Sequence, residues 1–302
     1  MSTAAKYLSN IPLAEYTTYK IGGPAQHLYI PQSFDELKNA ALHLKESRQH
    51  YHIIGGGSNL LIADRGLEQP VILMAECCRD LVQMENILES GAGTKLADLV
   101  EYSIEHSLAG LQALSGIPGT VGGAVIMNAG AYGSEISHCL SEVIVIDEMG
   151  AVKEIPHPEV RFAYRSSPGL TGKLILRARF RLRKGKKAEL KQKAQEIIGL
   201  RKAKQPYDLP SAGSVFKKHP LGPAGLLIEQ AGLKAFRIGD AQISPKHANF
   251  IVNLGKARAI EVLALIRHIQ KVILQKFAVE LELEQRLLGF KQEELLNPEK
   301  FL

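Results

Sequence analysis

The residues best suited to chemistry lie in a glycine-rich stretch at positions 110–133, where seven of 24 residues are glycine. Glycine is used where the backbone takes a positive φ or where another group approaches it closely. The stretch also carries the hydroxyl of Thr120 and the amide of Asn128, which can donate to phosphate oxygens or to a heterocycle. We expect no ordinary helix or strand here, and the stretch indicates a nucleotide cofactor. A pair of tight turns between buried strands is the structural alternative.

A second glycine motif interrupts the apolar run at 53–62, with glycines at 55–57 followed by Ser58 and Asn59. It predicts a strand, a phosphate-binding turn and then a strand or helix. The motif is not a P-loop, because no lysine follows it. It also differs from the Rossmann fingerprint, because Leu60 stands where that motif needs glycine or alanine. The Gly91-x-Gly93 motif differs in the same way, because Leu96 stands at the corresponding position. The sequence therefore predicts a different kind of nucleotide cradle.

The composition is that of a globular protein, with 302 residues of which 45% are hydrophobic and 23% charged. This length exceeds what one hydrophobic core usually supports, so we expect two or three domains. The formal net charge of +6 favours anionic small molecules as ligands. Nucleic acid is not expected, because tryptophan is absent and the basic cluster at 191–204, which we interpret as a solvated helix face, carries no aromatic residue to stack bases. No run of 18 apolar residues occurs, so we expect no membrane insertion and a cytoplasmic location.

Cysteine and histidine patterns predict no metal site. Cys77, Cys78 and Cys139 lack metal-ligand spacing, and ten histidines are scattered without a HExxH pair. Cys77 and Cys78 are expected to be reduced, because adjacent Cα atoms lie about 3.8 Å apart, which is closer than disulfides usually allow.

Residues 1–70 are predicted to form a first α/β unit that delivers the glycine motif at 55–57. Ser33 and Glu36 form a capping box at the start of a helix with apolar residues at helical spacing, and a strand at 51–54 follows. A second helix over 94–108, with Thr94 as its N-cap, leads into the glycine-rich stretch.

Later segments alternate between strand and helix patterns. Residues 142–147 and 174–182 alternate like half-buried strands, which predicts a largely antiparallel unit within 71–200. Pro206 and Pro210 mark a linker into the last region, where a strand at 249–253 precedes a helix over 257–277.

Several longer motifs resemble those of the UDP-N-acetylenolpyruvoylglucosamine reductase family, in one order over nearly the full chain. They are TYKIGG at 18–23, GGGSNLL at 55–61, SGIPGTVGG at 115–123, NAGAYG at 128–133, FAYRSS at 162–167, SAGSVFK at 211–217, KHANF at 246–250 and LELE at 281–284. The resemblance implies an α+β fold of three domains. Two α/β subdomains, 1–70 and 71–200, would clasp FAD in the PCMH-type arrangement, and an α+β domain at 201–302 would bind substrate.

The resemblance also implies an oxidoreductase of peptidoglycan precursor synthesis. Non-covalently bound FAD would be reduced by NADPH and would pass a hydride to the enolpyruvyl ether of UDP-N-acetylglucosamine-enolpyruvate, giving UDP-N-acetylmuramate. We expect a monomer. The implied cofactor-binding residues are Tyr19, Ile21, Gly55, Gly56, Gly57, Ser58, Asn59, Leu60, Ser115, Gly116, Pro118, Gly119, Thr120, Gly122, Gly123, Ala124, Ala129, Gly130 and Ala131.

Three residues match the family's catalytic positions, namely Arg165, Ser214 and Glu284. Arg165 would meet the negative charge that develops on the substrate, since a guanidinium stays charged and can grip a carboxylate with two hydrogen bonds. Ser214 would protonate the α-carbon, and Glu284 would orient or protonate the intermediate. Strand alternation puts Glu282 and Glu284 on one face, so only the motif register selects Glu284. Without the family, Arg165 could be a structural ion pair and Ser214 a turn residue.

The substrate-binding positions implied by the resemblance are Tyr164, Lys204, Lys217, His247 and Asn249. The chain departs from the family at 214–220, where SVFKKHP replaces Ser-x-Phe-Lys-Asn-Pro, with an extra residue and no asparagine. The sequence therefore does not predict the substrate contact that this asparagine makes in the family. The short segment after Arg165 resembles the shorter subclass, which lacks a tyrosine-bearing lid.

Two other functions are alternatives. Flavin oxidases with a similar FAD fold often attach FAD to a histidine in the first glycine loop, but this loop has Ser58 and Asn59, which excludes covalent attachment there. A non-catalytic nucleotide-binding module would not need Arg165, Ser214 and Glu284 in their three motifs.

Overall fold

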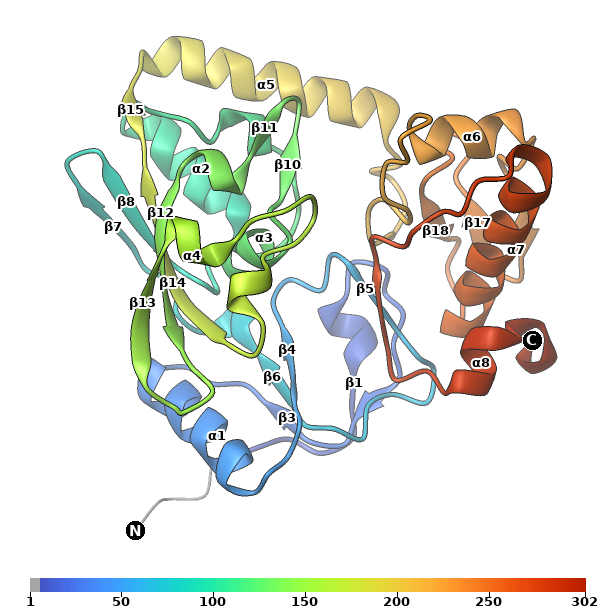
Figure 1. Cartoon of the computed structure of the whole chain (residues 1–302), viewed down its shortest axis with the longest axis horizontal. Coiled ribbons are helices and arrows are strands. Elements are labelled where there is room, and N and C mark those ends of the chain that lie inside the picture. Colours follow the sequence, from blue (N-terminus) through green and yellow to red (C-terminus); the bar gives the residue numbers. More distant parts are fainter. Residues whose placement is uncertain (1–5) are drawn as a thin grey trace. The chain divides into compact units, whose positions relative to one another are not determined.

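The computed structural model describes residues 6–302, drawn in Figure 1, and these residues form two compact units. Unit 1 contains Leu28–Gly56, Gln69–Arg201 and the described residues before Ser9, whereas unit 2 contains Ser9–His27, Gly57–Glu68 and Lys202–Leu302. Each unit is assembled from separate segments of the chain and has its own hydrophobic core. The mixture of helices and strands in both confirms the α+β fold class.

The larger sheet of unit 1 is antiparallel and has the strand order β13-β12-β14-β8-β7. Its strands are β7 (Leu81–Met84), β8 (Ile87–Gly91), β12 (Leu140–Ile146), β13 (Val152–Pro156) and β14 (Leu174–Arg181). The strands predicted at 142–147 and 174–182 are therefore confirmed, and so is their antiparallel pairing.

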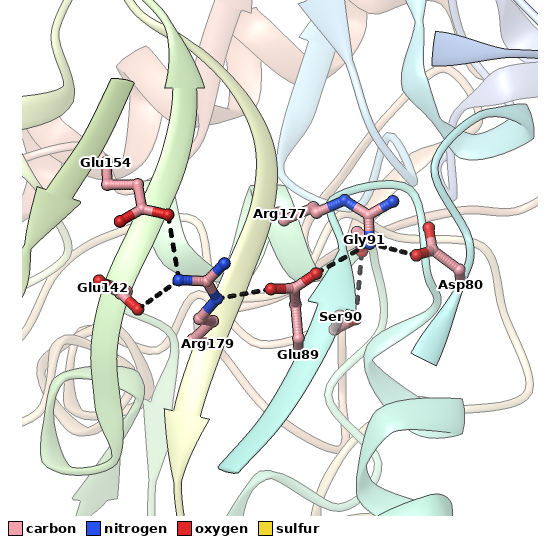
Figure 2. A network of polar contacts seen from close by, with 8 residues as sticks. All are labelled: Asp80, Glu89, Ser90, Gly91, Glu142, Glu154, Arg177 and Arg179. Carbon is pink, nitrogen blue, oxygen red and sulfur yellow. Dashed lines mark hydrogen bonds and ion pairs between the residues drawn. The ribbon is translucent and has the colours of Figure 1, made fainter. Parts of the chain in front are cut away.

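A row of alternating charges crosses this sheet and is shown in Figure 2. Arg179 on β14 lies between Glu89 of β8, at 2.5 Å from Nε, and Glu142 of β12, at 2.7 Å from Nη1. Arg177 continues the row by pairing with Glu89 and with Asp80. The hydrogen bonds that Arg179 donates to Glu142 and Glu89 raise its pKa, so its charge is fixed. Cross-strand pairs of opposite charge stabilise the strand register.

A second sheet of unit 1 is parallel, with the order β3-β6-β4, and leads into the first glycine motif. Its strands are β3 (Leu28–Tyr29), β4 (His52–Ile54) and β6 (Val71–Leu73). The predicted helix is α1 (Phe34–Glu46), and Ser33 Oγ accepts from Glu36 N at 3.2 Å as an N-cap. The Glu36 carboxylate, however, accepts from Gln32 N at 2.8 Å. Only the Ser33 half of the predicted capping box forms, because the Glu36 carboxylate binds the N–H of Gln32 and not that of Ser33.

The second predicted helix is shorter than expected, and Thr94 is not its N-cap. Helix α2 (Leu96–Glu105) begins after Lys95, whose side chain makes no capping bond. Thr94 is held by the glycine-rich stretch, because its carbonyl accepts from Val121 N at 2.9 Å. Leu108 lies outside the helix, in β9 (Leu108–Ala109), which pairs with β15 (Arg183–Lys184).

The glycine-rich stretch does contain a helix, which corrects the expectation that none would form there. Helix α3 (Val121–Ile126) is capped by Thr120, whose Oγ1 accepts from Gly123 N at 3.5 Å. Gly122 allows a close approach to Ala92, because a Cβ at 122 would lie 3.0 Å from Ala92 Cβ. A small hairpin follows, made of β10 (Gly130–Ala131) and β11 (Ser134–Glu135).

Unit 1 also contains α4 (His157–Val160), which packs on β12 and β13, and most of α5 (Lys187–Lys204). Helix α5 buries only Ala194, Ile197 and Arg201, which confirms that its lysines form a solvated face. The two units together also contain short 3-10 helices, at Leu13–Tyr16, Met74–Glu76, Gln112–Leu114, Ile136–His138, Pro168–Leu170 and Pro298–Phe301.

Unit 2 is organised around α7 (Ala259–Phe277), which matches the helix predicted over 257–277. Val262, Ile266, Ile269 and Ile273, whose spacing predicts one apolar face of this helix, are fully buried. Asp64, from another segment of unit 2, accepts from Ala259 N at 2.7 Å and from Ile260 N at 3.1 Å, so it caps the helix start. The other elements are β1 (Ile11–Pro12), β2 (Pro24–Ala25), β5 (Leu60–Ile62), β16 (Arg237–Ile238), β17 (Ala241–Ile243), β18 (Ile251–Asn253), β19 (Arg286–Leu288), α6 (Ala224–Gln230) and α8 (Gln292–Leu296). Among residues 6–302, no helix is both long and apolar enough to span a membrane.

Candidate functional site

The two glycine motifs lie against each other within unit 1. A Cβ on Gly55 would be 2.3 Å from Thr120 Oγ1, and a Cβ on Gly56 would be 2.7 Å from Gly119 Cα. Only glycine permits such an approach. The structure therefore brings together two loops that the sequence predicts to bind the same cofactor.

Two buried hydroxyls of unit 1 have no hydrogen-bond partner within the described chain. They are Ser115 Oγ, at the start of the SGIPGTVGG motif, and Thr94 Oγ1, whose carbonyl is bonded to the same motif. Buried polar atoms are nearly always satisfied, so unpartnered ones call for an explanation such as a ligand. These hydroxyls fit a cofactor with hydrogen-bonding groups, as FAD has.

Asn128 is not available as a ligand donor, which corrects the expectation from its sequence. Its Nδ2 donates to Glu135 Oε1 at 2.8 Å and to the Ala163 carbonyl at 3.3 Å, and its Oδ1 accepts from Ser137 N at 3.0 Å. The residue is fully buried. Its amide therefore holds three segments of unit 1 together.

The other predicted cofactor residues of unit 1 occupy turns and element ends. Ser115, Gly116, Pro118 and Gly119 form the turn before α3, with Gly116 at φ +76° and Gly119 at φ +112°. Gly122, Gly123 and Ala124 lie in the first turns of α3, and Ala129, Gly130 and Ala131 lie at β10.

The TYKIGG motif supports the first glycine loop inside unit 2. Thr18 N donates to the Gly57 carbonyl at 3.2 Å, and a Cβ on Gly57, which has φ +59°, would lie 2.0 Å from Tyr16 O. Tyr19 and Ile21 are buried in the core of unit 2, and burial raises the pKa of Tyr19. The structure thus gives both residues a packing role behind the loop that continues into Ser58, Asn59 and Leu60.

Arg165 occupies an unusual backbone position. Ala163 and Ser166 exchange two backbone hydrogen bonds of 3.0 and 3.1 Å around Tyr164 and Arg165, and Arg165 has φ +56°. This left-handed region favours glycine or asparagine, and large residues held there cluster at functional sites. Arg165 Nη2 donates to the Gly130 carbonyl at 3.2 Å, and its guanidinium lies 5.1 Å from the centroid of the half-exposed Tyr164 ring. Arg165 is therefore brought beside the NAGAYG motif.

In unit 2, the segment that carries Ser214 pairs with the segment that carries Glu284. Glu284 N donates to the Val215 carbonyl at 2.9 Å, Lys217 N donates to the Glu282 carbonyl at 2.9 Å, and Phe216 forms an antiparallel bridge with Leu283. Asn59 Nδ2 also donates to the Glu284 carbonyl, at 3.0 Å. The structure therefore unites two predicted catalytic motifs with the end of the first glycine loop.

Glu282 and Glu284 have different surroundings. The Glu282 side chain is 73% exposed and forms an ion pair with Lys217. Lys217 thus already has a carboxylate partner. Glu284 is half-buried, so burial distinguishes the two glutamates, which sequence spacing alone could not do.

Asn249 contacts the Ser214 segment, and His247 contacts Asn249. Asn249 accepts from Phe216 N at 3.0 Å and donates to Phe216 O at 2.9 Å, and its own carbonyl accepts from Val215 N at 2.8 Å. His247 Nδ1 accepts from Asn249 N at 3.2 Å, and burial lowers the pKa of His247, which favours the neutral ring. Asn249 is thus a clamp on the backbone at Phe216.

Arg201 is a residue that the sequence interpretation missed. It is buried on α5, its Nε has no hydrogen-bond partner within the described chain, and its guanidinium lies 5.7 Å from the Tyr132 ring centroid. Its spacing from Ala194 and Ile197, the other buried residues of α5, could have marked it as inward-facing. Lys204, one turn further along the chain, is exposed.

The cysteines and acidic residues form no metal centre within residues 6–302. All three cysteines are free, and the thiols of Cys77 and Cys78 lie 3.2 Å apart in a hydrogen bond.

Family models match both parts of the chain. Residues 25–155 match the model of an FAD binding domain. Residues 205–288 match the C-terminal domain of UDP-N-acetylenolpyruvoylglucosamine reductase.

Full-length relatives agree with these matches. The chain is 42% identical over 288 residues to a UDP-N-acetylenolpyruvoylglucosamine reductase of Caldanaerobacter subterraneus subsp. tengcongensis, covering 95% of each chain. It is 43% identical over 285 residues to one of Lactobacillus gasseri, covering 93% of each. A crystal structure of the Thermus caldophilus enzyme superposes with a TM-score of 0.79 at 37% identity, covering 94% of this chain and 99% of that one. The chain belongs to the UDP-N-acetylenolpyruvoylglucosamine reductase family and is an FAD-dependent oxidoreductase.

Proposed function

We propose that this protein reduces the enolpyruvyl ether of UDP-N-acetylglucosamine-enolpyruvate to the D-lactyl ether of UDP-N-acetylmuramate, with NADPH as the electron source, in peptidoglycan precursor synthesis. The pairing of 214–217 with 282–285 carries the proposal, because two motifs with acid–base residues lie side by side. A nucleotide-binding module without chemistry has no use for that pairing.

The cradle of unit 1 suits FAD, which when bound supplies the hydride for the vinyl carbon. Backbone N–H groups of the two glycine motifs would bind the pyrophosphate, which is how turns of this kind hold anions. Ser115 and Thr94 would complete their hydrogen bonds with the cofactor's polar groups.

Arg165, Ser214 and Glu284 are the proposed catalytic residues. Arg165 would bind the substrate carboxylate and stabilise the negative charge that develops there, in a site from which water is excluded. Ser214 would donate its hydroxyl proton to the α-carbon, which must be strongly basic because serine is a weak acid. Glu284 would orient the intermediate from the paired segment.

Tyr164, Lys204, Lys217 and His247 are proposed to contact the UDP-sugar, with Lys204 near its diphosphate. Asn249 would act through Phe216, because both polar groups of its side chain already bind that residue's backbone. We keep the three-domain division at residues 70 and 200, a monomeric state and a cytoplasmic location as parts of the proposal.

The test is to measure bound flavin together with NADPH oxidation. Purified protein should be yellow, release intact FAD on denaturation, and oxidise NADPH only when the enolpyruvyl substrate is present. Colourless protein that does not take up added FAD would refute the proposal. Rapid NADPH-independent oxidation of a substrate by oxygen would favour a flavin oxidase, and bound flavin without turnover would favour a non-catalytic module.

A further inference from the structure

Glu135, on β11, has a carboxylate that is held by two donors. Its Oε1 accepts from Asn128 Nδ2 at 2.8 Å and from Ser137 Oγ at 2.7 Å. Burial alone would raise the pKa of Glu135, but these hydrogen bonds and the charges of His138 and Arg165 together outweigh it, and the pKa lies below the usual range. The residue is therefore a fixed negative charge at neutral pH.

This charge is connected to Arg165 in three ways. Glu135 pairs in register with Gly130, whose carbonyl accepts from Arg165 Nη2 at 3.2 Å. Asn128, which binds Glu135, also donates to the Ala163 carbonyl at 3.3 Å, at the base of the turn that carries Arg165. The positive charge of Arg165 is close enough to contribute to the lowered pKa of Glu135.

These contacts hold the backbone turn that carries Arg165. Arg165 has a φ of +56°, a conformation that a large residue keeps only when its surroundings over-determine it. A hydrogen bond to an ionised acceptor is stronger than one between neutral groups. The ionised Glu135 thus supplies the strong contact that holds Asn128, and Asn128 in turn holds the turn.

We propose that Glu135 is a positioning residue that fixes the backbone turn and the guanidinium of Arg165 for contact with the substrate carboxylate. The inference rests on the proposed function, in which Arg165 meets that carboxylate. Glu135 itself touches no reacting atom. A purely structural hairpin clamp is the competing explanation.

The first experiment compares Glu135→Gln with Glu154→Gln. Glu135→Gln keeps a side-chain oxygen that can accept both hydrogen bonds and removes the negative charge. Glu154, in the same unit, is exposed and forms an ion pair with Arg179 at 3.1 Å. Glu135→Gln should retain FAD and its reduction by NADPH. It should slow flavin reoxidation by the enolpyruvyl substrate about 10- to 100-fold, as expected for a misplaced catalytic group. Glu154→Gln should match the wild type in both half-reactions.

A double-mutant cycle separates positioning from simple structural damage. In an Arg165→Lys background the loss caused by Glu135→Gln should nearly disappear, because there is no guanidinium left to position. A structural clamp would give the same loss in both backgrounds, and that result would overturn the inference. Equal reoxidation rates in Glu135→Gln and Glu154→Gln would also overturn it.

Ser137→Ala is a second variant should Glu135→Gln fail to fold. It removes one hydrogen bond to Glu135 and keeps the charge, so reoxidation should slow by a smaller factor while flavin reduction is unchanged. Slowing of both half-reactions alike would contradict positioning. A wild-type protein without turnover on the enolpyruvyl substrate would instead refute the proposed function, so the two failures are distinguishable.

Discussion

Unit 1 and unit 2 hold their proposed functional residues by different physical means. In unit 1, Arg165 lies at a positive φ, the glycine motifs touch backbone to backbone, and the hydroxyls of Ser115 and Thr94 lack partners within the described chain. In unit 2, the Ser214 segment is bonded on both sides, to the Glu284 segment and to Asn249.

This difference predicts different effects of a bound cofactor on the two units. The unit 2 segment has backbone groups of residues 215–217 paired within unit 2. The unit 1 cradle has hydrogen bonds left to make, so cofactor binding should complete it, and a ligand that binds only the folded state stabilises that state. Variants in unit 2 should therefore change chemistry with flavin still bound, whereas variants in the cradle should change flavin binding.

The largest effect is expected for Ser214→Ala. Hydride transfer from NADPH to flavin needs no proton donor at the substrate carbon, so it should continue. Reoxidation by the enolpyruvyl substrate should slow about 10²- to 10⁴-fold, the usual contribution of general acid catalysis, and Ser214→Cys should recover part of it. Stopped-flow flavin absorbance measures each half-reaction, with Ser211→Ala as the control. If both halves slow alike, Ser214 is a structural turn residue.

Gly56→Val should weaken FAD binding about 10- to 100-fold, the cost of overpacking a tight contact. A Cβ at this position would lie 2.7 Å from Gly119 Cα, so the two glycine motifs must separate. Gly199→Val is the matched control, because a Cβ there meets nothing within 4 Å. Titration of the apoprotein with FAD measures the affinity. Stoichiometric flavin in folded Gly56→Val would contradict the contact.

Asn249→Ala should lower the free energy of unfolding by about 2 kcal/mol, because the buried N–H and carbonyl of Phe216 lose their partners. It should also slow reoxidation by substrate without lowering flavin content, since the clamp holds the Ser214 segment. Urea denaturation of the apoprotein measures stability, with the exposed Asn39→Ala as control. Unchanged stability together with weaker substrate binding would mean that Asn249 contacts the substrate directly.

The sequence predicted well those features that depend on local pattern. The buried stripe of α7 and the alternation of β12 follow directly from residue spacing, and both are confirmed. The family motifs pointed to the correct family, because their order over the chain is far more specific than any single glycine pattern.

Features that depend on distant contacts were not predictable. Thr94 looks like an N-cap, but its carbonyl is bonded to Val121, which moves the start of the helix. Asn128 looks like a ligand donor, but Glu135, Ser137 and Ala163 take up its amide only once the chain has folded. In each case a hydrogen bond to a residue distant in the sequence overrides the local preference. A single sequence does not show which distant residue will be the hydrogen-bond partner.

Ser115→Ala should have the smallest effect, and it tests most directly whether a ligand completes the cradle. Its buried hydroxyl has no partner in the described chain, so the apoprotein should lose no stability when it is removed. The FAD complex should lose one hydrogen bond, about 0.5–1.5 kcal/mol, which corresponds to roughly 2- to 13-fold weaker binding. Ser103→Ala is the matched control, because Ser103 is equally buried but donates to the Val100 carbonyl at 2.7 Å.

The two serines should therefore behave in opposite ways. Ser103→Ala should destabilise the apoprotein and leave FAD affinity unchanged, whereas Ser115→Ala should do the reverse. Thermal unfolding with and without FAD, together with FAD titration, measures both. If Ser115→Ala destabilises the apoprotein as much as Ser103→Ala does, its hydroxyl has a partner already and the cradle of unit 1 is as complete without a ligand as the Ser214 segment of unit 2.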